Sequence, residues 1–522
     1  MKRILCILTA LLLLVGSAGA QELPSDAGRH SRVFYEIFVG SFSDSNGDGI
    51  GDLRGIINRM DYLRSPDGES EDSLGVEGLW LTPVFTSPSY HKYDVTDYYA
   101  IDPVFGTMED LRELISICHA RDVLLIMDLP LNHTGSSCSW FRQFAEAHLN
   151  HDQESPYYDF YSWIPSGDPV PAGRRFMPLD GTDILYECNF SDDMPELNFD
   201  NPSVLEEAVH IAAYYLDMGV DGFRFDAAKY VWLGDTERNI AFWKSYLEEL
   251  RSIDPEVYTV AEVWDSDAVV SEYIRAVNCF RFSTSQAEGA IASAAKGNNV
   301  NKLIRNTAAY LDTIHAFNPD SMPIPFISNH DMDRAAGFLP VSGGKAAMAA
   351  SLYLLSPGSP FIYYGEEIGL KGSRGASPTD ANRRCAMRWG DGDTVQDPDG
   401  FDYENQTEAT VAGMLEQDDS LLRHYQKVLS VRRSYPEIAE GSYEPLVFDD
   451  SKAGGFLSSL DSSVILVLHN TTTKQVTLDL KNVTEHSFSE ISVVLEAVPG
   501  KGGASLEDGT VILGPQTSVI IR

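Results

Sequence analysis

The sequence predicts an α/β protein: a (β/α)₈ TIM barrel with an excursion domain after its third strand and a C-terminal antiparallel β-sandwich. Three observations predict this fold. Short, almost continuously apolar runs alternate with amphipathic helical patterns from residue 33 to about 440, as parallel strands buried on both faces require. About 65 residues rich in Tyr, Pro, Gly and Asp interrupt this alternation once. After Gly441 the pattern changes to short strands separated by turn residues.

Eight apolar runs are the candidate barrel strands. The run VLLIM, which begins at Val123, is typical, because an uninterrupted apolar run indicates a strand covered on both faces. Eight such strands with helices between them indicate a closed barrel. The predicted strands are Val33–Val39, Val76–Thr82, Val123–Asp128, Val220–Asp226, Val257–Glu262, Cys279–Ser283, Ile324–Asn329 and Pro360–Tyr364.

Capping residues mark the helices between these strands. Thr107 followed by Asp110 resembles a capping box, in which each side chain bonds the other residue's backbone N–H. Asn201 followed by Pro202 gives an N-cap and a first-turn proline. Gly219 then supplies the glycine that commonly closes a helix.

The long interruption lies between His133 and Asn201. Because structureless loops of that length are uncommon, it is predicted to be a small domain beside the barrel mouth. The predicted C-terminal strands are Leu446–Phe448, Ser463–His469, Gln475–Leu480, Ile491–Ala497 and Val511–Ile521. The resulting domains are a signal peptide (1–20), the two parts of the barrel (21–133 and 199–440), the excursion domain (134–198) and the β-sandwich (441–522).

The first twenty residues are typical of a secretion signal. Lys2 and Arg3 precede an apolar run over Ile4–Val15, and Ala18 and Ala20 place small residues before the predicted cleavage site. We therefore expect a secreted protein, extracellular or periplasmic, with no membrane association of the mature form. The formal net charge of −38 repels nucleic acid and anionic membranes, so a neutral molecule is the natural partner. We expect the chain to be a monomer.

Five cysteines follow the predicted signal, at spacings that match no zinc motif and no dense disulfide framework. Cys138 and Cys188 fall in the predicted excursion domain and are a candidate disulfide pair. The odd number leaves at least one thiol unpaired. Most of the five are expected to be small buried apolar residues.

Four acids stand at the ends of predicted barrel strands or one step beyond: Asp128, Asp226, Glu262 and Asp331. These strand ends meet at one mouth of a barrel, where the active sites of such folds lie. Like charges that converge repel one another and raise each other's pKa, so a functional role explains the four acids best. Cleavage of a glycosidic bond needs two flanking carboxyl groups, about 5 Å apart in retaining enzymes. Asp226 and Glu262 end adjacent strands and are the candidate pair.

The motifs around these acids resemble the four signature regions of the α-amylase family, glycoside hydrolase family 13, and occur in that family's order. They are DLPLNH (Asp128–His133), GFRFDAAKY (Gly222–Tyr230), the Glu262–Val263–Trp264 step and FISNHD (Phe326–Asp331). Weaker matches are GLWLTPVF (Gly78–Phe85), MPELN (Met194–Asn198) and GSPFIYYGEEIG (Gly358–Gly369). The resemblance runs from about Val33 to the C-terminus and implies an α-glucan or maltooligosaccharide substrate.

The resemblance also implies a role for each site residue. Asp226 would attack the anomeric carbon, Glu262 would be the general acid and base, and Asp331 would hold sugar hydroxyls. Asp128 would support the site by pairing with Arg224, which would keep the nucleophile charged. The implied substrate-binding residues are Tyr93, His133, Arg224, Lys229 and His330.

The segment DSNGDGIGD has the ligand spacing of an EF-hand-like calcium loop, although Gly55 stands where the bidentate glutamate of a full EF-hand would be. We therefore predict a structural Ca²⁺ site with ligands from Asp44, Asn46, Asp48, Ile50 and Asp52. The family resemblance adds Asn132 as a ligand of a second calcium site. Tyr230 departs from the histidine that is frequent in the family at a position that contributes a carbonyl to this second site.

Three enzymatic functions fit these motifs: an endo-acting α-amylase, an exo-acting α-glucosidase or oligo-1,6-glucosidase, and a neopullulanase or cyclomaltodextrinase. MPELN resembles the MPDLN of the third group and of intermediary amylases rather than the QPDLN of oligo-1,6-glucosidases. Only a dozen residues precede the first strand after the predicted cleavage site, and the third group usually has an extra N-terminal domain. We predict a retaining α-amylase that acts by double displacement. A carbohydrate-binding or transporter-accessory protein is the non-enzymatic alternative, which the presence of all three catalytic acids disfavours.

Overall fold

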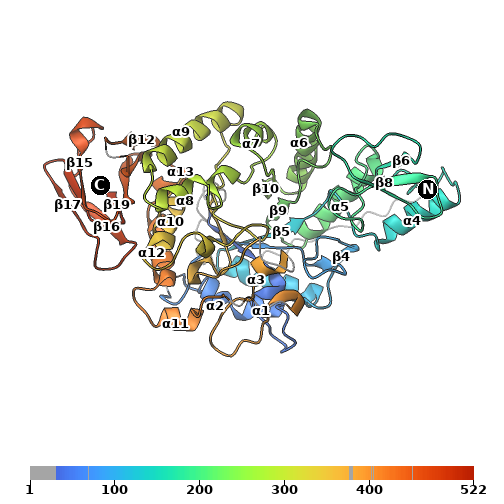
Figure 1. Cartoon of the computed structure of the whole chain (residues 1–522), viewed down its shortest axis with the longest axis horizontal. Helices are drawn as coiled ribbons and strands as arrows, with labels where there is room; N and C mark the ends of the chain where they lie inside the picture. The colour runs from blue at the N-terminus through green and yellow to red at the C-terminus, as the bar shows by residue number, and fades with distance from the viewer. Residues whose placement is uncertain (1–30, 69, 375–379, 401–402, 404, 450) are drawn as a thin grey trace, which may run out of the picture.

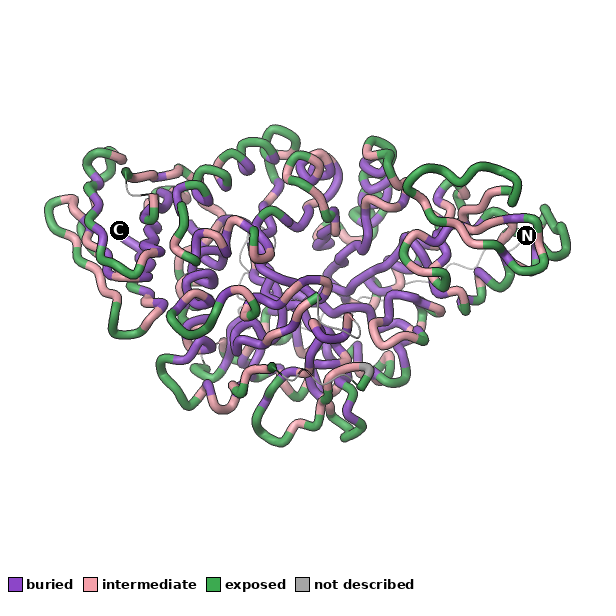
Figure 2. Tube along the Cα trace, viewed as in Figure 1, coloured by how far each residue is buried: buried purple, intermediate pink, exposed green. Residues whose placement is uncertain are grey.

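A computed structural model describes residues 31–522, except 69, 375–379, 401–402, 404 and 450. The predicted signal peptide lies outside the described residues. The molecule is elongated: the barrel forms its centre, the C-terminal sheets lie at one end, and the elements inserted after the third barrel strand lie at the other (Figure 1). Buried residues concentrate on the barrel strands and the inner faces of its helices, and exposed residues on the outer loops (Figure 2).

Six parallel strands form most of the barrel, in the order β10-β9-β5-β2-β1-β11. Two short segments complete the ring through the parallel bridges Ala261↔Cys279 and Phe280↔Ile324. The N–H of Phe361 then donates to the carbonyl of Pro325 at 3.1 Å, which closes the circle and confirms the predicted barrel. The strands are β1 (Phe34–Ile37), β2 (Gly78–Leu81), β5 (Leu124–Leu129), β9 (Gly222–Phe225), β10 (Tyr258–Ala261) and β11 (Phe361–Tyr363).

The predicted sixth and seventh strands, Cys279–Ser283 and Ile324–Asn329, are wrong in length. Each segment contributes isolated bridges only, and Phe282–Thr284 turns into a 3₁₀ helix. Pro323 and Pro325 flank the second bridge and lack the N–H that a continuous strand ladder needs. The chain therefore passes through both barrel positions without building regular strands there.

The barrel interior is filled by aromatic and aliphatic side chains. Phe34 and Phe361 stack with ring centroids 4.8 Å apart, and Trp80 and Phe280 pack above them in the same buried cluster. Gly78 leaves the space for this packing, because a Cβ there would lie 2.4 Å from the ring of Phe34. Since the interior is packed, a ligand has access only to the mouth of the barrel.

The helices begin where the capping signals place them. In α3 (Met108–Ala120) Thr107 and Asp110 form the predicted capping box, and Asn201 caps α5 (Pro202–Leu216). No helix of the described residues is long and apolar enough to cross a membrane. The other helices are α1 (Leu53–Asn58), α2 (Met60–Leu63), α6 (Thr236–Ile253), α7 (Asp267–Tyr273), α8 (Ala290–Ala295), α9 (Val300–Phe317), α10 (Lys345–Leu354), α11 (Val411–Leu415), α12 (Leu421–Ser434) and α13 (Glu437–Glu440).

Between β5 and α5 the chain builds a small separate unit. It contains α4 (Ser139–Leu149) and an antiparallel sheet in the order β6-β8-β7, and Phe141 of α4 packs edge-on against Tyr186 of that sheet. A bridge between His133 and Glu196 brings the start and end of the unit together at the barrel mouth. Its strands are β6 (Trp163–Pro165), β7 (Phe176–Pro178) and β8 (Ile184–Glu187), and the hairpin β3 (Phe85–Thr86) and β4 (Asp97–Ile101) follows β2.

The C-terminal region forms two antiparallel sheets, in the orders β12-β13-β14-β19-β16 and β15-β18-β17. Strands β13 and β17 were not predicted, and the one predicted strand Val511–Ile521 is in fact the two strands β18 and β19. Adjacent glycines such as Gly454 and Gly455 are typical of turns, yet β13 requires Gly455, because a Cβ there would lie 1.8 Å from the carbonyl oxygen of Val467. The strands are β12 (Glu444–Val447), β13 (Ala453–Leu460), β14 (Ser463–Asn470), β15 (Val476–Asp479), β16 (Ile491–Glu496), β17 (Ala504–Glu507), β18 (Thr510–Leu513) and β19 (Thr517–Ile521).

The five cysteines of the described chain are buried free thiols, so the candidate disulfide between Cys138 and Cys188 is wrong. The two residues lie in different surroundings: Cys138 contacts Tyr161 and Thr134, whereas Cys188 lies near Arg175. Burial raises the pKa of both thiols, as expected for small buried residues.

Candidate active site

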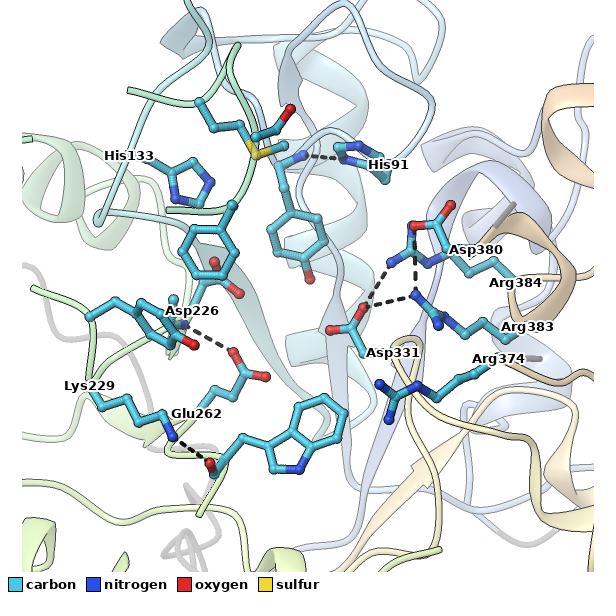
Figure 3. A pocket seen from close by; sticks show the side chains of 17 residues that line it. His91, His133, Asp226, Lys229, Glu262, Asp331, Arg374, Asp380, Arg383 and Arg384 are labelled. Atoms are coloured by element: carbon cyan, nitrogen blue, oxygen red, sulfur yellow. Dashed lines mark hydrogen bonds and ion pairs between the residues drawn. The ribbon is translucent and has the colours of Figure 1, made fainter. Parts of the chain in front are cut away.

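Three of the acids found at strand ends line one cavity of about 550 Å³. Asp226 follows β9, Glu262 follows β10, and Asp331 follows the seventh barrel segment. Figure 3 shows Asp226 and Glu262 on one side of the cavity and Asp331 facing them from the other. The cavity therefore lies where the carboxyl ends of the strands meet, and a ligand inside it contacts all three carboxyl groups.

One buried guanidinium group connects the carboxylates of three neighbouring strands. Arg224 lies on β9, and its side chain is inaccessible to solvent. Its Nη1 lies 2.6 Å from Asp226 Oδ1 and 2.8 Å from Asp128 Oδ1, and its Nη2 lies 3.1 Å from Glu262 Oε2. A delocalised cation in this place offsets the repulsion among the carboxylates. Because Asp226 and Glu262 contact the two terminal nitrogens of one group, they lie close together.

The environment of Glu262 brings the pKa of its carboxyl group close to neutral pH. Burial raises the pKa of Glu262, Arg224 lowers it, and the negative charges of Asp226 and Asp331 raise it; together these effects give a pKa of about 7. The backbone N–H of Ala227 donates to Oε2 at 3.1 Å and fixes the orientation of the carboxyl group. A carboxyl group with this pKa exchanges its proton readily at neutral pH, as a general acid and base must.

Asp331 has the opposite electrostatic environment. Burial alone would raise its pKa, but His330, whose Nε2 lies 3.1 Å from Oδ2, and Arg384, whose Nη2 lies 2.9 Å from Oδ1, outweigh burial and hold the pKa well below its usual range. Asp331 is therefore a permanent anion on the cavity wall. Its carboxylate oxygens accept hydrogen bonds, which suits a hydroxylated ligand.

Tyr93 contacts both Asp128, which is paired with Arg224, and His330, which is paired with Asp331. Its hydroxyl group donates to Asp128 Oδ2 at 2.7 Å and lies 2.7 Å from His330 Nε2. The rings of Tyr93 and His330 are nearly parallel, with an interplanar angle of 9° and centroids 5.4 Å apart. One edge of the tyrosine ring is thus fixed while the residue lines the cavity.

His133 and Lys229 also line the cavity, but their polar atoms differ in whether they already have hydrogen-bond partners. His133 is buried, and its Nε2 has no hydrogen-bond partner among the described residues, which leaves this nitrogen for a ligand. The ammonium group of Lys229 contacts the carbonyl oxygen of Trp264 at 2.7 Å and Asp265 at 3.0 Å. Lys229 therefore links the segment after β9 to Trp264 and Asp265, which follow Glu262.

A charged cluster that was not predicted from the sequence follows β11. Arg384 contacts Asp331, lies 3.1 Å from Asp380 and donates from Nη1 to the hydroxyl of Tyr90 at 2.8 Å. These residues fall in a segment without strand or helix periodicity, and the signal that was available is the pair of adjacent arginines shortly after the eighth strand. Other cavity residues that were missed are His91, Phe190, Ser191, Met194, Arg374 and Arg383.

The predicted calcium loop is folded by its own acidic side chains. Asp44 accepts the backbone N–H groups of Gly47 at 2.7 Å and Gly49 at 2.8 Å, and the hydroxyl of Thr394 at 2.6 Å. Burial raises the pKa of Asp44, but these hydrogen bonds outweigh burial and lower it. Asp52 is buried and caps α1 through Gly55.

The loop offers an oxygen-only donor set, the kind that calcium prefers. The side chains of Asn46 and Asp48 and the backbone of Ile50 are at the exposed part of the loop, with Asp44 beside them. Among the described residues, however, no group of three or more His, Cys, Asp or Glu side chains is close enough to hold a metal ion. The oxygen donors of the loop are therefore of the type that calcium prefers. Fewer than three of them are carboxylates that lie close enough together to share one ion.

Asn132 lies outside the loop, at the junction of the barrel and the excursion unit. It is buried, and its side-chain amide donates to Glu196. Burial and then the negative charge of Glu187 raise the pKa of Glu196, hydrogen bonds from Asn189 and Asn132 lower it, and the resulting pKa is about 8. Glu196 and the neighbouring Glu187 form another oxygen-rich group, in which one carboxylate oxygen of Glu187 has no hydrogen-bond partner among the described residues.

A barrel with paired carboxyl groups at its mouth is the architecture of a glycoside hydrolase or glycosyl-transfer enzyme. Residues 36–441 match the family model described as the α-amylase catalytic domain. The chain is 35% identical over 494 residues to α-amylase 3 of Dictyoglomus thermophilum, with 94% of this chain and 93% of that protein covered. It is 35% identical over 354 residues to 4-α-glucanotransferase of Thermotoga maritima, covering 65% of this chain and 72% of that protein.

The solved structure of Eubacterium rectale Amy13B superposes with a TM-score of 0.86 at 30% identity, covering 94% of this chain and 96% of that one. The chain belongs to the α-amylase family, glycoside hydrolase family 13. It is an enzyme that acts on α-glucans, either as a retaining glycosidase or as a transferase.

Proposed function

We propose that this protein is a retaining α-amylase that cleaves internal α-1,4 bonds of starch-like glucans and maltooligosaccharides. The observation that carries the proposal is the arrangement around Arg224, where Asp226 and Glu262 share one guanidinium group and Glu262 has a pKa of about 7. Similarity over nearly the whole chain to a protein named α-amylase supports the substrate class. The signal-like residues 1–20 support export from the cell.

In the first step Asp226 attacks the anomeric carbon while Glu262 donates its proton to the glycosidic oxygen. The bond to the leaving chain breaks, and a β-linked glucosyl ester of Asp226 forms. In the second step Glu262, now a carboxylate, takes a proton from water, whose oxygen attacks the same carbon. The ester bond breaks, Asp226 leaves as a carboxylate paired with Arg224, and the product has the α configuration.

The remaining polar residues position the sugar in this proposal. Asp331 is the fixed anion that accepts hydrogen bonds from sugar hydroxyls, and these bonds strengthen as charge develops on the ring. His133 offers its unpartnered Nε2 to a further hydroxyl. Tyr93, fixed at its hydroxyl end, presents its ring to the apolar face of the sugar.

The proposal predicts an alkaline limit set by Glu262. A general acid acts only when protonated, and the protonated fraction falls as the pH rises through a pKa of about 7. We expect kcat/KM for maltooligosaccharides to fall about tenfold per pH unit above that value. With α-maltosyl fluoride, whose leaving group needs no proton, this limb should disappear; an identical limb with both substrates would contradict the assignment.

A 4-α-glucanotransferase is the second candidate, because one relative of comparable identity carries that name. Transfer and hydrolysis share the ester intermediate and differ in whether a sugar hydroxyl or water accepts the glucosyl group. Incubation with maltotriose separates them: hydrolysis increases the number of reducing ends, whereas transfer makes longer chains at a constant number. Turnover of pullulan or cyclodextrin faster than starch would favour a neopullulanase or cyclomaltodextrinase.

We also propose that the loop from Asp44 to Asp52 binds one structural Ca²⁺. Bound calcium stabilises the folded state by about 2.7 kcal/mol when its free concentration is 100 times the Kd. We therefore expect EGTA to lower the melting temperature by several degrees and added calcium to restore it. Asp48→Asn should remove this response, whereas the matched control Asp168→Asn, an exposed acid in the excursion unit, should keep it. Identical melting curves with metal analysis confirming calcium removal would contradict the site.

A further inference from the structure

A buried glutamate on the first barrel strand contacts a residue of the site but does not line the cavity. Glu36 lies on β1 and is 1% exposed. Its Oε1 accepts a hydrogen bond from the backbone N–H of His330 at 3.2 Å and lies 2.6 Å from Nδ1 of the same residue. One carboxylate oxygen therefore holds both the backbone and the ring of His330.

The ring of His330 has hydrogen-bond acceptors on both sides. Nδ1 faces Glu36, while Nε2 faces the hydroxyl of Tyr93 at 2.7 Å and Asp331 Oδ2 at 3.1 Å. The Tyr93 hydroxyl proton is directed at Asp128, so its oxygen accepts from Nε2. Both ring nitrogens must then carry protons, which is the imidazolium form.

The charges around His330 favour this cation. The ring is fully buried between the carboxylates of Glu36 and Asp331; burial lowers its pKa, but Asp331 and then Glu36 outweigh burial and raise it to about 9. Two neighbouring cations, Arg383 and Arg384, donate from Nε to the carbonyl oxygen of His330 at 3.1 and 3.0 Å. They contact the backbone rather than the ring.

We propose that Glu36 is a positioning residue of the active site, which keeps His330 as an imidazolium whose Nε2 proton is directed at Asp331 and Tyr93. Glu36 is not among the residues that line the cavity, and it acts through His330, which contacts the lining residues Tyr93 and Asp331. The inference rests on the proposed function, since Asp331 and Tyr93 are its sugar-positioning residues. Without the negative charge of Glu36, His330 loses one of two counter-ions, and a neutral ring turns a lone pair toward the Asp331 carboxylate.

The substitution Glu36→Gln tests the charge while keeping the size of the side chain and its acceptor oxygen. We expect kcat/KM to fall at least tenfold at pH 7.5, and the deficit relative to the unsubstituted enzyme to shrink at pH 5.5, where His330 is protonated again. Deprotonation of Glu262 lowers kcat/KM of both proteins at alkaline pH, so this effect cancels when the kcat/KM of the variant is divided by that of the unsubstituted enzyme. A purely structural role for Glu36 gives a deficit that does not change with pH and would contradict the proposal.

The matched control is Glu367→Gln, which alters a carboxyl group of equal burial just after β11. Glu367 accepts the hydroxyl groups of Tyr35 and Tyr62, both at 2.6 Å, on the outer side of the barrel. Any loss of activity in this variant should be the same at both pH values. Glu36→Asp, which retains the charge, should show a smaller pH-dependent deficit than Glu36→Gln.

A direct measurement reports the charge of the His330 ring in the unsubstituted protein. In protein labelled with ¹⁵N-histidine, the ring signal of His330, assigned by its loss in His330→Gln, should show an imidazolium at pH 8. A neutral ring at pH 8 would overturn the proposal. The spectrum is independent of starch turnover: failure of the unsubstituted enzyme to hydrolyse starch would refute the proposed function, and a neutral His330 would refute the role of Glu36.

Discussion

Glu262→Gln is expected to reduce hydrolysis of maltooligosaccharides by a factor on the order of 10²–10⁴, the range that general acid–base catalysis contributes. Glutamine keeps the shape of the side chain and a carbonyl oxygen that accepts the N–H of Ala227, but it has no proton to give to the leaving oxygen. Binding should survive, because Asp331, His133 and Tyr93 are untouched. Steady-state kinetics with maltoheptaose and calorimetric titration of the variant with the same sugar measure both effects.

The matched control for this prediction is Glu237→Gln, an exposed glutamate on α6 that pairs with Arg275. It should retain the activity of the unsubstituted enzyme. Turnover of the Glu262→Gln variant within a few-fold of that enzyme would remove Glu262 from the role of acid and base. Loss of sugar binding together with activity would show that Glu262 acts by holding the substrate.

Asp226→Ala is expected to abolish turnover at least as completely, because no covalent ester can form. The small side chain opens a space beside the anomeric carbon for a substitute nucleophile. With α-maltosyl fluoride and azide, azide enters where Asp226 stood, fluoride leaves, and the product is the β-glycosyl azide. Product analysis by ¹H NMR gives the configuration.

Glu262→Ala supplies the comparison under the same conditions. Here Asp226 still forms the ester, azide attacks from the opposite face, the bond to Asp226 breaks, and the α-glycosyl azide results. The two variants should therefore give opposite configurations from one substrate. The same configuration from both, or rescue of neither, would contradict the assignment of nucleophile and acid/base.

The placement of Asp226 and Glu262 at one mouth of the barrel was predictable because the geometry of a parallel barrel is regular. Asp226 and Glu262 end apolar runs, and the carboxyl ends of parallel strands meet at one mouth, so their proximity follows from the strand pattern. The Asp128–Arg224 pair follows in the same way, since β5 and β9 are neighbours with these two residues in register. The cavity residues after β11 could not be placed, because no periodic pattern fixes the path of Asp380 to Arg384.

Glu36 shows a different limit of sequence reasoning. A single acid inside the apolar strand Phe34–Ile37 gives no sign of its partner, which lies 294 residues away at His330. Similarly, Gly454 and Gly455 indicate a turn when they are read alone, and only the close approach of β14 explains them within β13. Strand positions follow from local pattern, whereas contacts across the barrel depend on how the ring closes.

The anomeric configuration of the first product distinguishes a retaining mechanism through Asp226 and Glu262 from direct displacement by water. Hydrolysis of maltopentaose followed by ¹H NMR within the first minutes, before the free sugar mutarotates, reports the newly formed reducing end. We expect the α-anomer to appear first and the β-anomer only later, as the free sugar mutarotates. Initial formation of the β-anomer would show direct attack of water and would contradict the covalent intermediate.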